Sequence, residues 1–306
     1  MQKTRKRKKP QEVQLEPELE KSTRTGNGLR SQQEPYPTHP RPTPEECRAV
    51  RDSLLALHGF PQEFARYRRQ RPNLPSHDTD ESECSPIING DSRSGGEPES
   101  VLDGLVKTVL SQNTTEVNSL RAFANLKAAF PTWEDVLVAD AKTIENAIRC
   151  GGLAPTKASC IKNMLRLLLK KKGNLCLEYL RDLSVDEIKA ELSHFRGIGP
   201  KTVACVLMFH LQQDDFPVDT HVFEIAKTIG WVPLVADRNK TYLHLNQRIP
   251  NELKFDLNCL LYTHGKLCSR CTEKGGNLNR KKSCEDSCPL LDPCVNTGLN
   301  MADRID

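Results

Sequence analysis

The sequence predicts an all-α fold. From residue 101 onward, apolar residues recur at the i, i+3, i+4, i+7 spacing that places them on one face of a helix. Glycine, proline and capping residues divide this pattern into ordinary helical lengths, and no segment alternates as a half-buried strand does. Helices are expected at residues 101–111, 115–129, 133–137, 141–149, 155–172, 176–182, 184–194, 200–211, 220–229, 238–247 and 251–264.

One further helix is expected before residue 101. Thr43 can cap it and Pro44 suits its first position. An apolar stripe that reaches Leu57 marks its buried face, and Gly59 and Pro61 are expected to end it. Residues 1–42 and 75–98 are rich in polar residues, proline and glycine and lack this periodicity. They are therefore expected to be a disordered tail and a flexible linker.

The N-terminus is strongly basic, but the body of the chain is not. The segment KTRKRKKP at residues 3–10 contains six positive charges, so the net charge of +4 leaves residues 10–306 with about −2. Any DNA binding by the body must therefore come from a local arrangement of residues. The segment predicts a nuclear localisation signal, with a solvated tail as the alternative. No apolar run is long enough to cross a bilayer, so no membrane partner is expected.

The most informative segment combines a glycine hairpin, a lysine and an aspartate. Gly197 and Gly199 cannot continue a helix and favour a tight hairpin that a phosphate can approach closely. Pro200 suits the first position of the next helix, which places Lys201 in its first turn. Asp219 follows an extended stretch and precedes another helix, where it can act as the N-cap. An amine and a carboxylate thus stand at the beginnings of two helices.

This hairpin, together with the segment VDTH at 218–221, resembles the helix-hairpin-helix DNA glycosylases and most closely endonuclease III. The likeness spans roughly residues 100–294 and includes LSQNTT, GGL and the cysteine-rich tail. It implies a two-lobed helical fold. One lobe is expected at 99–219 and contains the hairpin motif at 184–211. The second lobe, with a metal-cluster loop, is expected at 220–306, and a helix at 43–74 is expected to pack on it.

The resemblance implies a bifunctional DNA glycosylase and apurinic/apyrimidinic (AP) lyase of base excision repair. It would act as a monomer on double-stranded DNA and remove damaged, oxidised pyrimidines. Lys201 would attack C1′ of the deoxyribose and form a Schiff base that permits β-elimination. Asp219 would stabilise the electron-poor sugar and help deprotonate the lysine. A solvated lysine and a plain helix cap are the alternative interpretations of these two residues.

Four further residues are expected to contact DNA. The resemblance implies that Gln112 and Leu153 enter the gap left by the extruded nucleotide, where an amide can pair with the orphaned base and a leucine can wedge the stack. Gly197 and Gly199 would receive a phosphate. An exposed glutamine at a helix end and an ordinary core leucine are the alternatives for the first two.

Five of the twelve cysteines lie between residues 268 and 294. In an intracellular chain this density favours a metal centre over disulfides. The resemblance implies an iron-sulfur (4Fe-4S) cluster held by Cys268, Cys284, Cys288 and Cys294, with Cys271 as an alternative first ligand. The spacing also fits a four-thiolate zinc site made of Cys268, Cys271, Cys284 and Cys288. A tail without metal is the third alternative.

Two other functions fit the same motifs. The segment FPVDTHV, followed by GWVPL, resembles the plant 5-methylcytosine DNA glycosylases, which are much larger proteins. A non-catalytic helix-hairpin-helix protein would use the hairpin for phosphate and Lys201 merely for its charge. The combination of Lys201 with Asp219 argues against this last function, because phosphate binding alone does not require a carboxylate.

Overall fold

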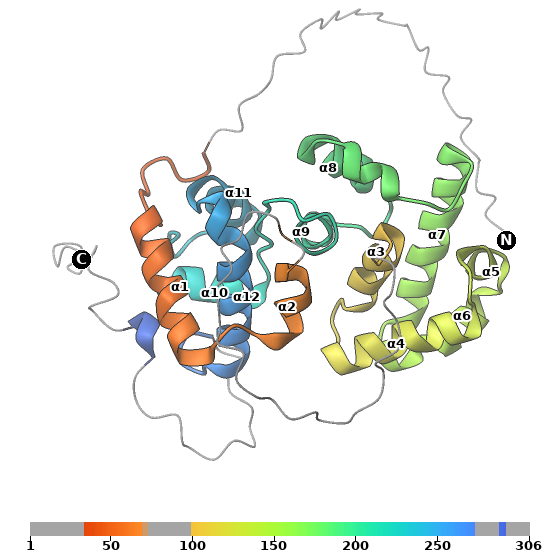
Figure 1. Cartoon of the computed structure of the whole chain (residues 1–306), viewed down its shortest axis with the longest axis horizontal. Helices are drawn as coiled ribbons and strands as arrows, with labels where there is room; N and C mark the ends of the chain where they lie inside the picture. The colour runs from red at the N-terminus through yellow and green to blue at the C-terminus, as the bar shows by residue number, and fades with distance from the viewer. Residues whose placement is uncertain (1–33, 70, 72–98, 273–287, 292–306) are drawn as a thin grey trace, which may run out of the picture. The chain divides into compact units, whose positions relative to one another are not determined.

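The computed structural model describes residues 34–69, 71, 99–272 and 288–291. The predicted all-α class is confirmed, because these residues form twelve α-helices and three short 3-10 helices and contain no strand. Figure 1 shows α1 and α10–α12 in one group and α3–α8 in another, with α9 between them. The helices are α1 (Pro44–His58), α2 (Gln62–Arg69), α3 (Val101–Leu110), α4 (Glu116–Ala129), α5 (Trp133–Val138), α6 (Ala141–Ala147), α7 (Ala154–Lys172), α8 (Val185–Ser193), α9 (Pro200–Phe209), α10 (Thr220–Thr228), α11 (Arg238–Arg248) and α12 (Asn251–Leu267).

The group α3–α8 encloses a hydrophobic core together with one face of α9. Val203, Val206 and Leu207 form that face, and each is at most 4% exposed. On the other side of the contact, Gly104 of α3 lies so close to α9 that an added Cβ would be 2.4 Å from the ring of His210. This packing fixes α9, and therefore its first turn, relative to α3.

A second core is formed by α1, α10, α11 and α12. α1 begins at a capping box, in which Thr43 Oγ1 accepts a hydrogen bond from the amide of Glu46 and the Glu46 carboxylate accepts one from the amide of Thr43. Two unpaired amides at the helix start are thereby satisfied. The buried residues of α1 are Cys47, Val50 and Leu54.

The last turn of α1 differs from the predicted stripe. Leu57, which was expected on the buried face, is 46% exposed. The neighbouring His58 faces α12 instead, and its Nε2 lies 3.0 Å from Nδ1 of His264. The contact between α1 and α12 therefore changes from apolar packing to a hydrogen bond at this end.

α2 is a helix that the sequence analysis did not predict. Pro61, which was expected only to end the preceding helix, stands immediately before it. The guanidinium of Arg68 donates two hydrogen bonds, of 3.0 and 2.8 Å, to the carboxylate of Asp256 in α12. Phe64 stacks on Phe209 of α9 with 5.5 Å between ring centroids. These contacts fix α2 against α9 and α12.

None of the described helices is long and apolar enough to cross a membrane. The basic segment at 3–10, predicted as a nuclear localisation signal, lies outside the described residues, as does the predicted linker at 75–98. Residues 34–42 belong to the expected tail, and they lie against the second core. Glu34 accepts a 2.6 Å hydrogen bond from Arg248 Nε.

Candidate active site

The predicted glycine hairpin connects α8 to α9. Gly197 has a φ of 93°, and a Cβ at this position would lie 2.8 Å from Sγ of Cys160. Both observations require glycine here. Gly199 has an extended backbone, and nothing lies within 4 Å of where its Cβ would be. The hairpin is therefore open at Gly199 to a ligand that approaches the backbone.

Lys201 lies in the first turn of α9. Pro200 occupies the first helical position, as predicted. The side chain of Lys201 is exposed. The next residue, Thr202, is buried, and its Oγ1 accepts a 3.0 Å hydrogen bond from Nε2 of Gln112. This bond and the buried face of α9 fix the backbone from which Lys201 extends.

Asp219 caps α10, as its place in the sequence predicted. Its Oδ1 accepts a 2.8 Å hydrogen bond from the amide of Val222. The extended stretch before it is fixed by Asn258 of α12, whose Nδ2 donates to the carbonyl of Pro217 at 2.8 Å. A carboxylate has about four acceptor positions, so Asp219 can accept further hydrogen bonds besides the capping bond.

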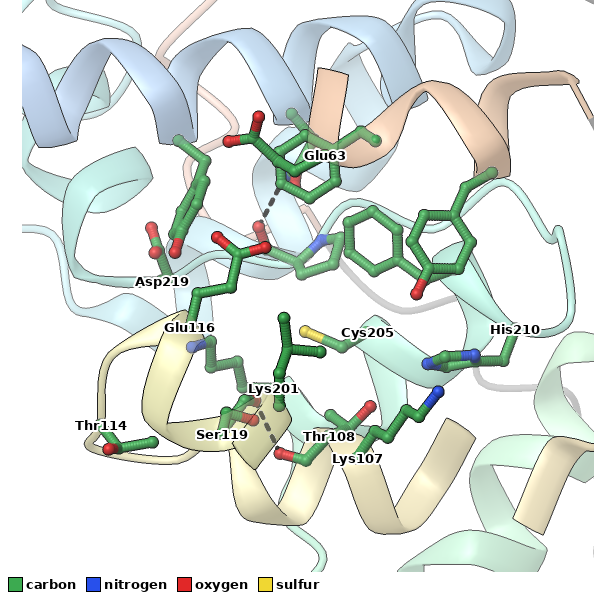
Figure 2. Close-up of a pocket in the computed structure, with 18 of the residues that line it drawn as sticks. Glu63, Lys107, Thr108, Thr114, Glu116, Ser119, Lys201, Cys205, His210 and Asp219 are labelled. Carbon is green, nitrogen blue, oxygen red and sulfur yellow. Dashed lines mark hydrogen bonds between the residues drawn. The ribbon is translucent and has the colours of Figure 1, made fainter. Parts of the chain in front are cut away.

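Lys201 and Asp219 line the same pocket, which has a volume of about 270 Å³. The other lining side chains come from α2, α3, α4, α9, α10 and α12 and from the segments that precede α4 and α10. Figure 2 shows Lys201, Asp219 and Glu116 together at one end of this pocket, and Lys107 and His210 at the other. An amine beside carboxylates can act as a nucleophile while a fixed negative charge stabilises a cationic centre.

Burial keeps three other side chains of the pocket uncharged at neutral pH. Desolvation raises the pKa of the Cys205 thiol to about 11. It also raises the pKa of the Tyr262 phenol to about 12, with a contribution from nearby carboxylates. Desolvation lowers the pKa of His210 to about 4. Because only a thiolate is strongly nucleophilic, Cys205 does not compete with the amine of Lys201.

One wall of the pocket is aromatic. Phe64 and Tyr67 of α2 pack on Phe209 with ring centroids 5.5 and 5.4 Å away. Phe64 also meets the edge of Tyr262 at 5.9 Å. This wall was not predicted from the sequence, because α2 was not predicted. Glu116 was not predicted as a site residue either, and its signal was its place in the first turn of a predicted helix.

Gln112 and Leu153 lie in two loops that one buried amine connects. Leu153 has a left-handed backbone with a φ of 49° and is 53% exposed, so it is not a core leucine. Lys157 of α7 is 2% exposed, and its Nζ donates to the carbonyls of Leu110 at 2.7 Å and Gly151 at 2.8 Å. Burial lowers the pKa of Lys157. Each carbonyl stands two residues before one of the two predicted DNA contacts, so this amine fixes the spacing of the loops.

A second polar cluster lies at the end of α12. Its four ligand atoms all lie within 4.8 Å of one another and belong to His264, Cys268, Cys271 and Cys288. Two ligands of the predicted cluster, Cys284 and Cys294, lie outside the described residues. His264 was not predicted as a ligand from the sequence. Its signal was the spacing of four residues to Cys268, since residues i and i+4 share a helix face.

Known proteins resemble this chain in sequence and in fold. A match to the HhH-GPD superfamily of base excision DNA repair proteins covers residues 106–251. The chain is 65% identical to a candidate DNA glycosylase of Arabidopsis thaliana, over 84% of this chain and 87% of that protein. The chain belongs to the HhH-GPD superfamily. The matched HhH-GPD region contains Gln112, Leu153, Lys201 and Asp219, whereas α1, α2 and the cysteines of the second cluster lie outside it.

This HhH-GPD protein is also similar to a solved structure and to a second plant protein. The structure of an endonuclease III in a non-covalent complex with DNA superposes with a TM-score of 0.56 at 20% identity, covering 82% of this chain and 94% of that chain. This likeness establishes the fold. The DNA glycosylase/AP lyase ROS1 of Arabidopsis thaliana is 31% identical over 53% of this chain, which corresponds to 12% of ROS1.

Proposed function

We propose that this HhH-GPD protein is a bifunctional DNA glycosylase and AP lyase that removes oxidised pyrimidines from double-stranded DNA. The observation that carries this proposal is the pocket that Lys201 and Asp219 share. The amine and the carboxylate are the two groups that the reaction needs, and each extends from a helix start that its own packing fixes. The family membership supports the same chemistry.

A base must leave the duplex before it can enter this pocket. Extrusion is least costly for a damaged or mismatched base, and side chains can fill the gap that it leaves. Leu153 is exposed and suited to wedge the stack. Gln112, whose Nε2 donates to Thr202, can offer its amide oxygen to the orphaned base. The open backbone at Gly199 suits a phosphate. The aromatic wall then offers the extruded base a surface for stacking.

Lys201 is the proposed nucleophile. Its neutral amine attacks C1′ while the bond from C1′ to the base breaks, and the base leaves with that electron pair and takes up a proton. Asp219 stabilises the positive charge on the sugar and accepts the proton that the amine loses. The sugar then opens to a Schiff base between Nζ and C1′. Loss of a C2′ proton expels the 3′ phosphate by β-elimination, and water finally hydrolyses the Schiff base.

The proposal is tested by base release and strand cleavage on duplexes of one sequence. Each duplex carries a single thymine glycol, 5-methylcytosine or unmodified thymine at the same position. We expect release of thymine glycol together with strand cleavage, and no release of thymine. Base release without cleavage would contradict the lyase activity. Tight binding without release from any duplex would contradict catalysis and favour a non-catalytic DNA-binding protein.

A second candidate substrate is 5-methylcytosine. The segments FPVDTHV and GWVPL resemble the plant 5-methylcytosine glycosylases, and 31% identity to the DNA glycosylase/AP lyase ROS1 supports the resemblance. Faster release of 5-methylcytosine than of thymine glycol in the same assay would establish this substrate in place of oxidised pyrimidines.

Replacing Lys157 by methionine is expected to weaken DNA binding as well as stability. The carbonyls of Leu110 and Gly151 would lose their donor, at a cost of about 1–3 kcal/mol each. Lys162→Met is the matched control, because Lys162 is also buried in α7 but donates to the carbonyl of Ala139. Both variants should unfold at lower urea concentrations.

The two variants are distinguished by the dissociation constant for duplex DNA, measured by fluorescence anisotropy at a temperature where both are folded. Lys157→Met should bind at least about tenfold more weakly than Lys162→Met, which corresponds to about 1.4 kcal/mol. Equal dissociation constants would show that Lys157 contributes only to stability and does not position the two loops.

A further inference from the structure

The cluster at the end of α12 is arranged around one point. Nε2 of His264 lies 3.4 Å from Sγ of Cys271 and 3.4 Å from Sγ of Cys288, and these two sulfurs are 3.2 Å apart. Sγ of Cys268 completes the set within 4.8 Å. Around one tetrahedral zinc ion, with bonds of about 2.3 Å to sulfur and 2.0 Å to nitrogen, ligand atoms are ~3.5–3.8 Å apart.

Local structure explains how α12 presents two of these ligands. Cys268 caps the C-terminus of the helix, and its amide donates to the carbonyl of His264 at 2.8 Å. The hydroxyl of Thr272 then donates to the carbonyls of Gly265 at 3.0 Å and Cys268 at 3.3 Å. The chain therefore turns back at the helix end. This turn brings Cys271, three residues after Cys268, to the same point.

The imidazole of His264 is oriented by a second histidine. His264 is 2% exposed, and its Nδ1 lies 3.0 Å from Nε2 of His58 at the end of α1. A proton shared between these two nitrogens leaves Nε2 of His264 free to face the sulfurs. A histidine that binds a metal through one ring nitrogen is commonly oriented by a hydrogen bond at the other. His58 therefore occupies the place of a positioning residue.

The four donors that the described residues bring together do not have the arrangement of an iron-sulfur cluster. In a four-iron cluster each of four thiolates binds a different iron atom, so the sulfurs must stand apart around the cluster. The described group offers three thiolates and one imidazole, and its atoms are close enough to share one ion. Three cysteines and one histidine form a common closed zinc site, and the spacing Cys-x2-Cys is typical of one.

We propose that His264, Cys268, Cys271 and Cys288 bind a single structural zinc ion. The four ligands leave no open position, so the ion holds chain segments together and takes no part in base excision. It joins the end of α12 to the 3-10 helix at Pro289–Leu291. Through His58, it also fixes the last turn of α1. The zinc ion thus stabilises the second core, which carries α10 and the segment that presents Asp219.

Metal analysis of the purified full-length protein tests this proposal. We expect one zinc per chain and no broad visible absorbance. Four iron atoms per chain with a brown colour would overturn the proposal in favour of a cluster, and metal-free protein would overturn it as well. Replacement of the ion by cobalt should give the visible bands of a tetrahedral site with thiolate ligands. This measurement uses the wild-type chain and therefore needs no variant that folds poorly.

Single substitutions identify the ligands. His264→Ala should lower the zinc content, whereas Cys284→Ser and Cys294→Ser should leave it at one per chain, as should Cys176→Ser at an exposed cysteine. Loss of the metal in Cys294→Ser with retention in His264→Ala would overturn the ligand set. His58→Phe should weaken zinc affinity by about 10–100-fold in competition with a chelator. An unchanged affinity would show that His58 does not position the ligand.

Discussion

The Lys201→Ala variant is expected to bind a duplex with an abasic site but to form no covalent adduct with it when borohydride is added. Borohydride reduces a Schiff base to a stable amine, so the adduct reports the nucleophile directly. Alanine preserves the helix, since it has the highest helix propensity. Removal of the attacking amine should slow base release by about 10³-fold or more, as the loss of a covalent nucleophile does in other enzymes.

Two lysine variants sharpen this result. Lys201→Arg keeps the positive charge but cannot supply a neutral nucleophile, because the guanidinium stays protonated in proteins. It should therefore bind DNA and still give no adduct. Lys107→Ala removes a lysine at the opposite end of the pocket and should still give the adduct. An adduct that persists in Lys201→Ala and disappears in Lys107→Ala would assign the nucleophile to Lys107.

The Asp219→Asn variant should release base about 10²-fold more slowly under single-turnover conditions while its thermal stability is nearly unchanged. Asparagine caps a helix about as well as aspartate, so α10 keeps its start. The substitution removes the negative charge that stabilises the cationic sugar, and the loss of one such electrostatic contact costs about 10²–10³-fold in rate. The pair of measurements separates the charge of Asp219 from its hydrogen bond to Val222.

The control is the same substitution at another helix start. Asp237 caps α11, where its Oδ1 accepts a 2.9 Å hydrogen bond from the amide of Lys240. Asp237→Asn should change neither stability nor rate. Asp219→Ala should lose both the charge and the cap, and should be destabilised by about 1 kcal/mol. A rate near that of the wild type in Asp219→Asn would mean that Asp219 serves only as a cap.

Local signals in the sequence predicted the parts of the site that depend on neighbouring residues. Pro200 and two glycines determine where α9 begins, so they place Lys201 without reference to the rest of the chain. Asp219 is likewise located by its own helix start. The all-α class follows from the spacing of apolar residues along each helix, which is also a local property.

The parts of the site that were not predicted from the sequence depend on contacts between segments that are distant along the chain. Phe64 and Tyr67 reach the pocket because Arg68 pairs with Asp256, which lies 188 residues away. The helix has only eight residues with two aromatic side chains, which is too short a stretch for its periodicity to establish a helix. His264 shows the same limit, because its role depends on a cysteine 24 residues later and on a histidine 206 residues earlier.

Lys201 is proposed to form the covalent bond to DNA, and peptide mapping of the borohydride-trapped complex identifies the bonded residue. The trapped wild-type protein is digested with a protease, and the peptide linked to deoxyribose is sequenced by mass spectrometry. We expect the modified residue to be Lys201. Attachment at another lysine, such as Lys107, or at the N-terminal amine would contradict it.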